Sequence, residues 1–202
     1  CITAITGVLM LCHSCAGPGY GKLVNPFVGT GGHGHTFPGA CYPFGMMQLS
    51  PDTRTEGWDA CSGYHFSDTA ILGFSHTHLS GTGVPDYCDF LVTPLRSDEG
   101  WPNFRLKGIP LTKGREEARA GYYRVNFPAE GIDAELTVGK RTGMHRYRFA
   151  GSRRRFVLLD LTHRDVLIGG CFTSWDSAGI RAFRRSTGWA KDQVLYFSAR
   201  FS

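Results

Sequence analysis

Apolar and polar residues alternate with a period of two along several stretches in the second half of the chain. The clearest are Ile132–Val138 and the stretch in which apolar side chains recur at every second position from Leu195 to Phe201. Such alternation is typical of a strand with one buried face. Further strands are expected at Gly121–Phe127, His145–Phe149, Phe156–Leu161 and Ile180–Arg184. Their spacing predicts an all-β fold, an antiparallel β-sandwich.

The first half of the chain has a different pattern. Residues 17–34 are rich in glycine, and short apolar runs interrupted by Pro and Gly continue to about Pro110. No helical period is sustained there, so little helix is expected. The last alternating stretch runs to Ser202 without a turn or polar cap. We therefore expect the sandwich to be incomplete at its C-terminal end, with the sheet continuing beyond Ser202.

Composition narrows the class of protein. The 202 residues are 42% hydrophobic and 19% charged, which excludes a disordered chain, a coiled coil and a collagen. A chain of this length can bury one substantial core. The net charge of +5 arises without concentrated basic runs. Arginines such as Arg153–Arg155 and Arg184 are interpreted as solvated strand faces and turns, and no nucleic-acid partner is expected.

The first residues resemble an export signal. Ile2–Leu11 is apolar and uncharged but too short to span a bilayer, as in the apolar region of a signal peptide. We expect residues 1–14 to be a partial signal peptide and 15–22 a linker. Cys15 follows a small residue, as in bacterial lipoproteins, and is the candidate lipidation site. The protein would be exported from a bacterium, as a periplasmic or cell-surface lipoprotein or in secreted form, touching membrane only through that lipid. The alternative is a buried N-terminal strand.

Four cysteines remain after the leader and Cys15 are set aside. No CxxC pair with metal-ligand spacing is present. Each is expected to be buried and free, although export would permit disulfides in any of three pairings. The four are Cys41, Cys61, Cys88 and Cys171.

Two sequence patterns suggest ligands. Gly29–Gly34 satisfies GxGxxG, but Pro26 disrupts the preceding strand and no helix can open at Phe37–Pro38, so we reject a dinucleotide site. The glycines permit close backbone approach to a ligand or another domain, or serve a tight turn. The pairs His33/His35 and His76/His78, with His65 as a further ligand, raise a zinc or iron hypothesis against the simpler interpretation of hydrogen-bonded histidines.

The segment Trp58–His65 combines an aromatic side chain, a carboxylate and small polar groups between turn residues. Sugar sites use this chemistry, because an aromatic face packs on the C–H side of a pyranose while carboxylates bind its hydroxyls. The competing interpretation is a core tryptophan of the sandwich.

A long ordered set of motifs resembles a known family, the glycoside hydrolase family 92 exo-α-mannosidases, in its N-terminal domain. The resemblance covers essentially all of residues 23–202. Three positions carry residues that are less common in the family: Cys41, Pro85 and Cys88. They weaken any inference about disulfides from the resemblance but do not affect the expected fold. The matching motifs are Val24–Ala40, Pro43–Met46, Gln48–Thr53, Gly57–Asp59, Phe74–Gly83, Ala120–Tyr123, Arg141–Gly143, Leu159–Leu161 and Arg184–Gln193.

This resemblance implies an N-terminal supersandwich-like domain over residues 23–202, packed on a C-terminal (α/α)6 barrel that is absent from this chain. The family cleaves terminal α-mannosides of glycans with inversion, here taken as α-1,2-linked, and uses calcium. The acid, the base and the calcium ligands belong mainly to the barrel. The resemblance therefore assigns no catalytic residue and no metal ligand to this chain, which alone would be inactive.

The chain's contribution would be one wall of the active-site cleft. The resemblance places contacts to mannose at Trp58, Asp59 and Cys61, with the Gly31–Gly32 loop nearby and Trp189 as a candidate for the neighbouring sugar. Its partners would be mannose-containing glycans and its own barrel. Two alternatives stay open: a stand-alone sugar-binding or structural module without catalysis, and, more distantly, a metal-dependent sandwich enzyme that uses the His-x-His pairs.

Overall fold

The computed structural model describes residues 19–98 and 108–202. The expected signal peptide (1–14) and Cys15 lie outside the described residues. In the described part, no helix has the length and apolar character needed to cross a membrane.

Strands dominate the described chain. Its helices are two short 3-10 turns, η1 (Tyr20–Leu23) and η2 (Trp58–Ala60). The strands, in chain order, are β1 (Ala40–Cys41), β2 (Gln48–Asp52), β3 (Ala70–Ile71), β4 (Gly73–Ser75), β5 (Leu91–Ser97), β6 (Ile109–Pro110), β7 (Glu116–Arg119), β8 (Tyr122–Phe127), β9 (Ile132–Val138), β10 (Gly143–Phe149), β11 (Arg154–Asp160), β12 (Val166–Trp175), β13 (Gly179–Thr187) and β14 (Gln193–Arg200).

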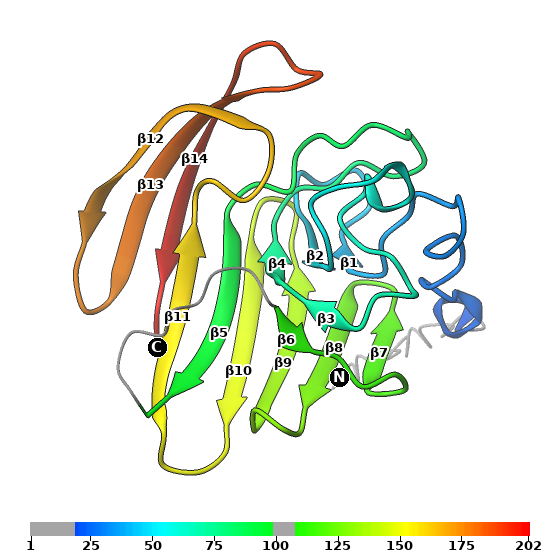
Figure 1. Ribbon diagram of the computed structural model, residues 1–202, viewed down its shortest axis with the longest axis horizontal. Helices are drawn as coiled ribbons and strands as arrows, with labels where there is room; N and C mark the ends of the chain where they lie inside the picture. The colour runs from blue at the N-terminus through cyan, green and yellow to red at the C-terminus, as the bar shows by residue number, and fades with distance from the viewer. Residues whose placement is uncertain (1–18, 99–107) are drawn as a thin grey trace, which may run out of the picture.

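Every strand pairing is antiparallel in the described residues. A five-stranded sheet has the order β1-β2-β4-β5-β11, and a four-stranded sheet has the order β10-β9-β8-β7. A third sheet, β12-β13-β14, stands beside them, and β3 pairs with β6 (Figure 1). The all-β antiparallel fold predicted from the alternation is confirmed.

The main core lies between the five-stranded and four-stranded sheets. Leu49 and Phe74 from β2 and β4 pack in one cluster with Tyr123 and Leu136 from β8 and β9. These four side chains are at most 1% exposed. The alternating burial along β8 and β9 is therefore the direct consequence of the period-two sequence pattern. The arrangement is a two-layer β-sandwich.

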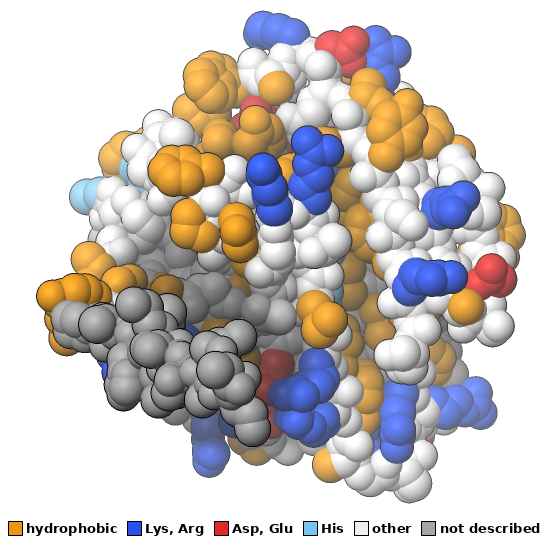
Figure 2. Space-filling view, turned by 180° about the vertical axis from the view of Figure 1, so that it is seen from behind, with side chains coloured by type: hydrophobic (Ala, Val, Ile, Leu, Met, Phe, Trp, Pro, Cys, Tyr) orange, Lys and Arg blue, Asp and Glu red, His pale blue; other side chains and the backbone are white. Residues whose placement is uncertain are grey.

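A second, smaller cluster joins the third sheet to the sandwich. Phe90 and Leu161 are buried against Ala182 of β13, and Phe197 of β14 stacks on Phe90 with ring centroids 4.8 Å apart. On the face shown in Figure 2, Lys and Arg side chains are dispersed and form no continuous basic track.

The strand expectations hold with shifts of a few residues at the ends. Ile132–Val138 is β9, while β10 begins two residues earlier than predicted, and β14 ends before Phe201. The pattern did not indicate β5 or β12. Pro94 lies within β5, and Gly169 and Gly170 interrupt the alternation in β12. The pairing of β12 with β13 shifts register between Leu167 and Gly169 and again between Phe172 and Ser174.

Two histidines, buried His76 and half-buried His145, link the sandwich layers. His145 of β10 donates from Nε2 to Nε2 of His76, 3.0 Å away, while His76 Nδ1 donates to the Phe90 carbonyl at 2.7 Å. Tyr147 completes the chain by donating to His145 Nδ1 at 2.7 Å. Burial lowers the pKa of His76 to about 4 and holds the pKa of His145 well below its ordinary value. Both rings are therefore neutral at physiological pH.

We expect the sandwich to lose stability in mild acid. The unfolded chain binds protons at these histidines near pH 6.5, whereas folded His76 does so only near 4, so stability is full above 6.5 and falls toward pH 4. The loss attributable to His76 is about 3 kcal/mol. Urea unfolding at pH 7.0 and 4.5 measures it, and a His76→Asn variant should show a smaller fall. An unfolding free energy that stays constant over this range would contradict the account.

Candidate functional site

Trp58 stands on the surface at the start of η2. The preceding Gly57 has φ +91°, a conformation that favours glycine, and it turns the chain into this short helix. The indole is 58% exposed and is bordered by the rings of His33 and His35, whose centroids lie 5.4 Å and 4.1 Å away. Trp58 is thus an accessible aromatic face rather than a core residue.

Asp59 lies beside this face. Its Oδ1 accepts a hydrogen bond from His33 Nδ1 at 2.5 Å, and the carboxylate side chain is 38% exposed. The hydrogen bond from His33 lowers the pKa of Asp59. Asp59 is therefore an ionised acceptor at neutral pH, and its second oxygen can accept hydrogen bonds from sugar hydroxyls. We call Trp58 and Asp59, with the bordering His33 and His35, the platform.

The Gly31–Gly32 loop is fastened beside the platform. His65 Nε2 donates to the Gly32 carbonyl at 3.1 Å, and the Phe66 amide donates to the Thr30 carbonyl at 2.8 Å. Gly32 has φ +58°. Gly34 is the position in this region that least tolerates a side chain, because an added Cβ would lie 1.9 Å from the carbonyl oxygen of Gly29. The glycine pattern thus permits a close self-contact of the loop.

The expectation that Cys61 touches the sugar needs correction. Its side chain is 1% exposed and burial raises the pKa of the thiol, so it is a neutral interior group behind the platform. The carbonyl oxygen of Cys61 also lies in the interior, where it accepts a hydrogen bond from buried Arg164 at 2.9 Å. The other cysteines are free in the structure, with Cys88 buried, but Cys41 is only half-buried and Cys171 is exposed, contrary to the expectation that all are buried.

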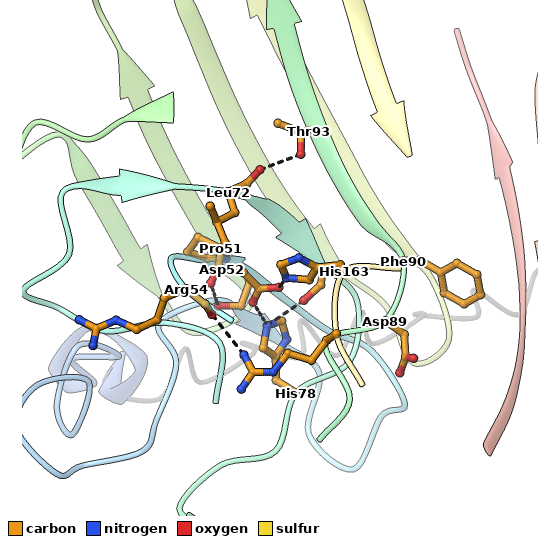
Figure 3. Close-up of polar contacts among 12 residues, drawn as sticks. Pro51, Asp52, Arg54, Leu72, His78, Asp89, Phe90, Thr93 and His163 are labelled. Carbon is orange, nitrogen blue, oxygen red and sulfur yellow. Dashed lines mark hydrogen bonds and ion pairs between the residues drawn. The ribbon is translucent and has the colours of Figure 1, made fainter. Parts of the chain in front are cut away.

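A buried carboxylate lies beneath the platform. Asp52, at the end of β2, accepts hydrogen bonds from His78 Nε2 and His163 Nε2, each at 2.8 Å, and lies between the two rings in Figure 3. All three side chains have 0% exposure. Burial alone would raise the pKa of Asp52, but the two imidazoles outweigh it and lower that pKa. The carboxylate is therefore ionised in the interior.

His78 holds that carboxylate in place by hydrogen bonding. Its Nε2 lies 2.8 Å from Asp52 Oδ1 and 3.0 Å from Ser75 Oγ, and its Nδ1 lies 2.8 Å from the carbonyl oxygen of Gln48. Removal of either Asp52 or His78 would leave the other buried group without this partner, which is costly.

The structure does not gather either His-x-His pair around one point. His33 bonds Asp59 while His35 packs on Trp58, and His76 bonds Phe90 and His145 while His78 bonds Asp52. His65 bonds Ser67 and Gly32. Within the described residues, the donor atoms nearest to a metal-ligand set belong to Asp52, His78 and Cys88, within 4.8 Å of one another. The hydrogen bond between His78 Nε2 and Asp52 Oδ1 already engages two of these three groups.

Trp189 lies on the turn between β13 and β14 and is 68% exposed. The turn is held by Asp86, whose Oδ2 accepts from the Ala190 amide at 3.0 Å. Three residues before Asp86, Gly83 approaches the platform so closely that an added Cβ would lie 3.0 Å from Trp58 Nε1. Trp58 and Trp189 therefore both border one short segment, residues 83–86.

Asp165 supports the same turn from below. An added Cβ at Gly188 would lie 2.5 Å from Asp86 Oδ1 and 3.5 Å from Asp165 Oδ1, so the two carboxyl groups meet under the turn. Burial raises the pKa of Asp165 to about 7, with further contributions from Asp86 and Asp89. At neutral pH this carboxyl group is close to half protonated.

Sequence analysis missed the tripeptide His163–Arg164–Asp165 between β11 and β12, whose members contact Asp52, the platform segment and Asp86. The one available signal was the run of polar and charged residues that directly follows the predicted strand Phe156–Leu161. The interpretation of Arg184 as solvated was wrong: it is 1% exposed and pairs with Asp89 at 2.7 Å. Arg153 to Arg155 are exposed as expected.

Comparison with known proteins gives consistent matches. The model of the glycosyl hydrolase family 92 N-terminal domain matches residues 23–202. A protein of Arthroderma benhamiae described as an uncharacterized secreted glycosidase is 29% identical over 153 residues, covering 70% of this chain and 20% of that protein.

Solved structures of a family GH92 alpha-mannosidase from Bacteroides thetaiotaomicron are also similar. The complex with mannoimidazole has a TM-score of 0.82 and 35% identity, covering 90% of this chain and 25% of that one. The structure described without a ligand has a TM-score of 0.83 at the same identity and covers 26% of that chain. This chain thus spans about a quarter or less of the length of these relatives.

Replacement of Asp165 by asparagine is expected to stabilise the protein at high pH. Because the pKa of Asp165 is raised to about 7 in the folded state, native stability falls as pH rises from about 4 through 7, where the carboxyl must ionise beside Asp86. Asp165→Asn removes that charge, so its melting temperature should exceed that of the wild type at pH 8, and the difference should be smaller at pH 5. Equal melting temperatures of the two proteins at pH 8 would show that the Asp86–Asp165 contact carries no such repulsion.

Proposed function

Because this chain belongs to glycosyl hydrolase family 92 as an N-terminal domain, we propose that it forms one wall of the active site of an exo-acting α-mannosidase. The substrate is a glycan with a terminal α-mannose, α-1,2-linked in the first instance. The observation that carries the proposal is the platform: an exposed tryptophan beside an ionised aspartate. The likeness to the Bacteroides alpha-mannosidase supports the choice of sugar.

The platform matches the two sides of a pyranose. The indole of Trp58 can pack on the C–H face of the ring, while Asp59 accepts hydrogen bonds from hydroxyl groups at its edge. His33 holds the carboxylate in place, which reduces the entropy lost when a sugar binds. Trp189, across residues 83–86, offers a second aromatic face for the neighbouring sugar.

We further propose an inverting mechanism. Inversion needs a general acid and a general base about 6.5–9.5 Å apart, so that a water molecule fits between the base and the anomeric carbon. Asp59 is unsuited as the acid because its pKa is lowered. Following the resemblance to the family, we place the catalytic pair in the rest of the protein, in an (α/α)6 barrel that packs against this domain. This chain binds and orients the sugar.

A calcium ion is part of the proposal, but the platform does not fit it. Calcium takes six to eight oxygen ligands. The carboxylates around Trp58 are engaged by basic side chains: Asp59 by His33, Asp68 by Arg54 and Asp52 by two histidines. We therefore assign the calcium ion to residues of the barrel, and sugar binding by this domain does not involve it.

Export completes the proposal. The curated fungal relative is described as secreted, which supports an extracytoplasmic site of action on glycans. The layout proposed for this chain is a partial signal peptide at residues 1–14, a linker at 15–22 with Cys15 as the lipid anchor, and the sandwich domain from residue 23.

Removal of the indole should impair the complete enzyme strongly. In Trp58→Ala we expect kcat/KM for α-1,2-linked mannobiose to fall about 100-fold, because a sugar-stacking aromatic contributes of the order of 2–3 kcal/mol. Trp175→Ala is the matched control, since Trp175 is 73% exposed at the end of β12, at the end of the third sheet opposite the Trp189 turn. A folded Trp58→Ala enzyme with unchanged kcat/KM would refute the platform as a sugar site.

The chain of 202 residues should release no mannose by itself. The acid, base and calcium site are assigned to the barrel, so purified chain incubated with α-1,2-linked mannobiose and calcium is expected to yield no free mannose. The complete enzyme under the same conditions is the positive control. Calcium-dependent turnover by the chain alone would mean that catalytic groups lie within it.

A further inference from the structure

We propose that Arg164 is the positioning residue that fixes the platform for α-mannoside binding. This inference rests on the proposed function of the platform. Arg164 does not reach the surface, because it is 4% exposed, and it acts through the backbone of the segment that carries Trp58 and Asp59.

The guanidinium of Arg164 holds both ends of that segment. Nη1 donates to the Arg54 carbonyl at 3.2 Å, and Nη2 donates to the carbonyls of Cys61 at 2.9 Å and Ala60 at 3.4 Å. Between these anchor points the chain passes over the exposed residues 55–58. One planar group thus sets the distance between the start and the end of the segment.

The segment has little internal support. η2 is three residues long, and its internal hydrogen bonds are those from the Cys61 amide to the Trp58 carbonyl at 3.2 Å and from the Gly63 amide to the Ala60 carbonyl at 2.9 Å. A single 3-10 turn of this length has poor hydrogen-bond geometry and is weakly stable alone. The position of the indole therefore depends on what holds the carbonyl groups of the turn.

Arg164 is itself held rigidly. Its own carbonyl accepts a hydrogen bond from Arg184 Nη2, and Arg184 is paired with buried Asp89 at 2.7 Å. The residue before it, His163, donates to buried Asp52. The β11–β12 connection is thus fastened to the core on both sides of the Arg164 side chain, which is what accurate positioning of the platform requires.

Arginine suits this role better than lysine. The guanidinium presents several N–H donors in one plane and can reach separate carbonyl groups at once, whereas an ammonium is a point charge on a flexible stem. Arg164→Lys preserves the charge and removes the geometry. Arg164→Gln, which is neutral, is a second variant that avoids a buried unpaired charge.

The test uses the complete enzyme and α-1,2-linked mannobiose. We expect Arg164→Lys and Arg164→Gln to lower kcat/KM about 10- to 100-fold, because a displacement of about 1 Å at a binding group costs that much. Introduced into Trp58→Ala, either substitution should cause little further loss, since the group it positions is already gone. Substitution of Arg164 should lower the melting temperature by the same amount with and without Trp58→Ala. A loss of kcat/KM that depends on Trp58 can then be told apart from a general loss of stability.

Arg96→Lys is the matched control. Arg96 also donates from a guanidinium to a backbone carbonyl, that of Glu130 at 2.7 Å, but this contact joins β5 to the β8–β9 turn in the sandwich. We expect Arg96→Lys to lower the melting temperature and leave kcat/KM unchanged.

Two results would overturn the inference while leaving the proposed function intact. One is wild-type kcat/KM in folded Arg164→Lys and Arg164→Gln when Trp58→Ala is impaired. The other is the same fold loss from Arg164 substitution with and without Trp58, which would indicate a role unconnected to the platform. Unchanged kcat/KM in Trp58→Ala itself would instead refute the platform as a sugar site, and the positioning role would fall with it.

Discussion

The site depends on the hydrogen bonds between the buried carboxylate of Asp52 and two histidine rings. They join three parts of the chain that are far apart in sequence: the end of β2, His78 after β4, and His163 between β11 and β12. An ionised group at this depth is stable only while both imidazoles remain in place. Formation of the platform is therefore coupled to completion of the sandwich core, since no local segment can supply all three partners.

The platform lies on the surface, and the residues that support it lie in the interior. Trp58 and Asp59 face the solvent and can contact a sugar, whereas Arg164 and Arg184 lie beneath them and bind backbone carbonyls. A short 3-10 turn, which is weak alone, is held in a defined position because buried Arg164 binds its carbonyl groups and Arg184 in turn binds the Arg164 carbonyl. The two tryptophan turns share residues 83–86, so a change in that segment affects both aromatic faces.

The period-two strands could be predicted because side chains on β8, β9 and β14 alternate between interior and solvent. β5 and β12 could not, since Pro94 and Gly169–Gly170 break the pattern while pairing with neighbouring strands still forms them. Trp58 and Asp59 were candidates from local chemistry, but the sequence also allowed a core tryptophan, and only the structure shows that the Trp58 side chain is exposed. Arg164 and His163 were not candidates, because their roles come from contacts more than 100 positions away in sequence, and Cys61 was assigned to the sugar although it points inward.

A crystal structure of the complete enzyme bound to a non-hydrolysable, sulfur-linked α-1,2-mannobiose tests the central claim most directly. We expect the Trp58 indole to lie in van der Waals contact with a mannose ring, at about 4 Å. Asp59 should accept a hydrogen bond from one of the hydroxyls of that ring, and Arg164 should still be bound to the Cys61 carbonyl. A sugar bound in the active site without contact to Trp58 or Asp59 would contradict it.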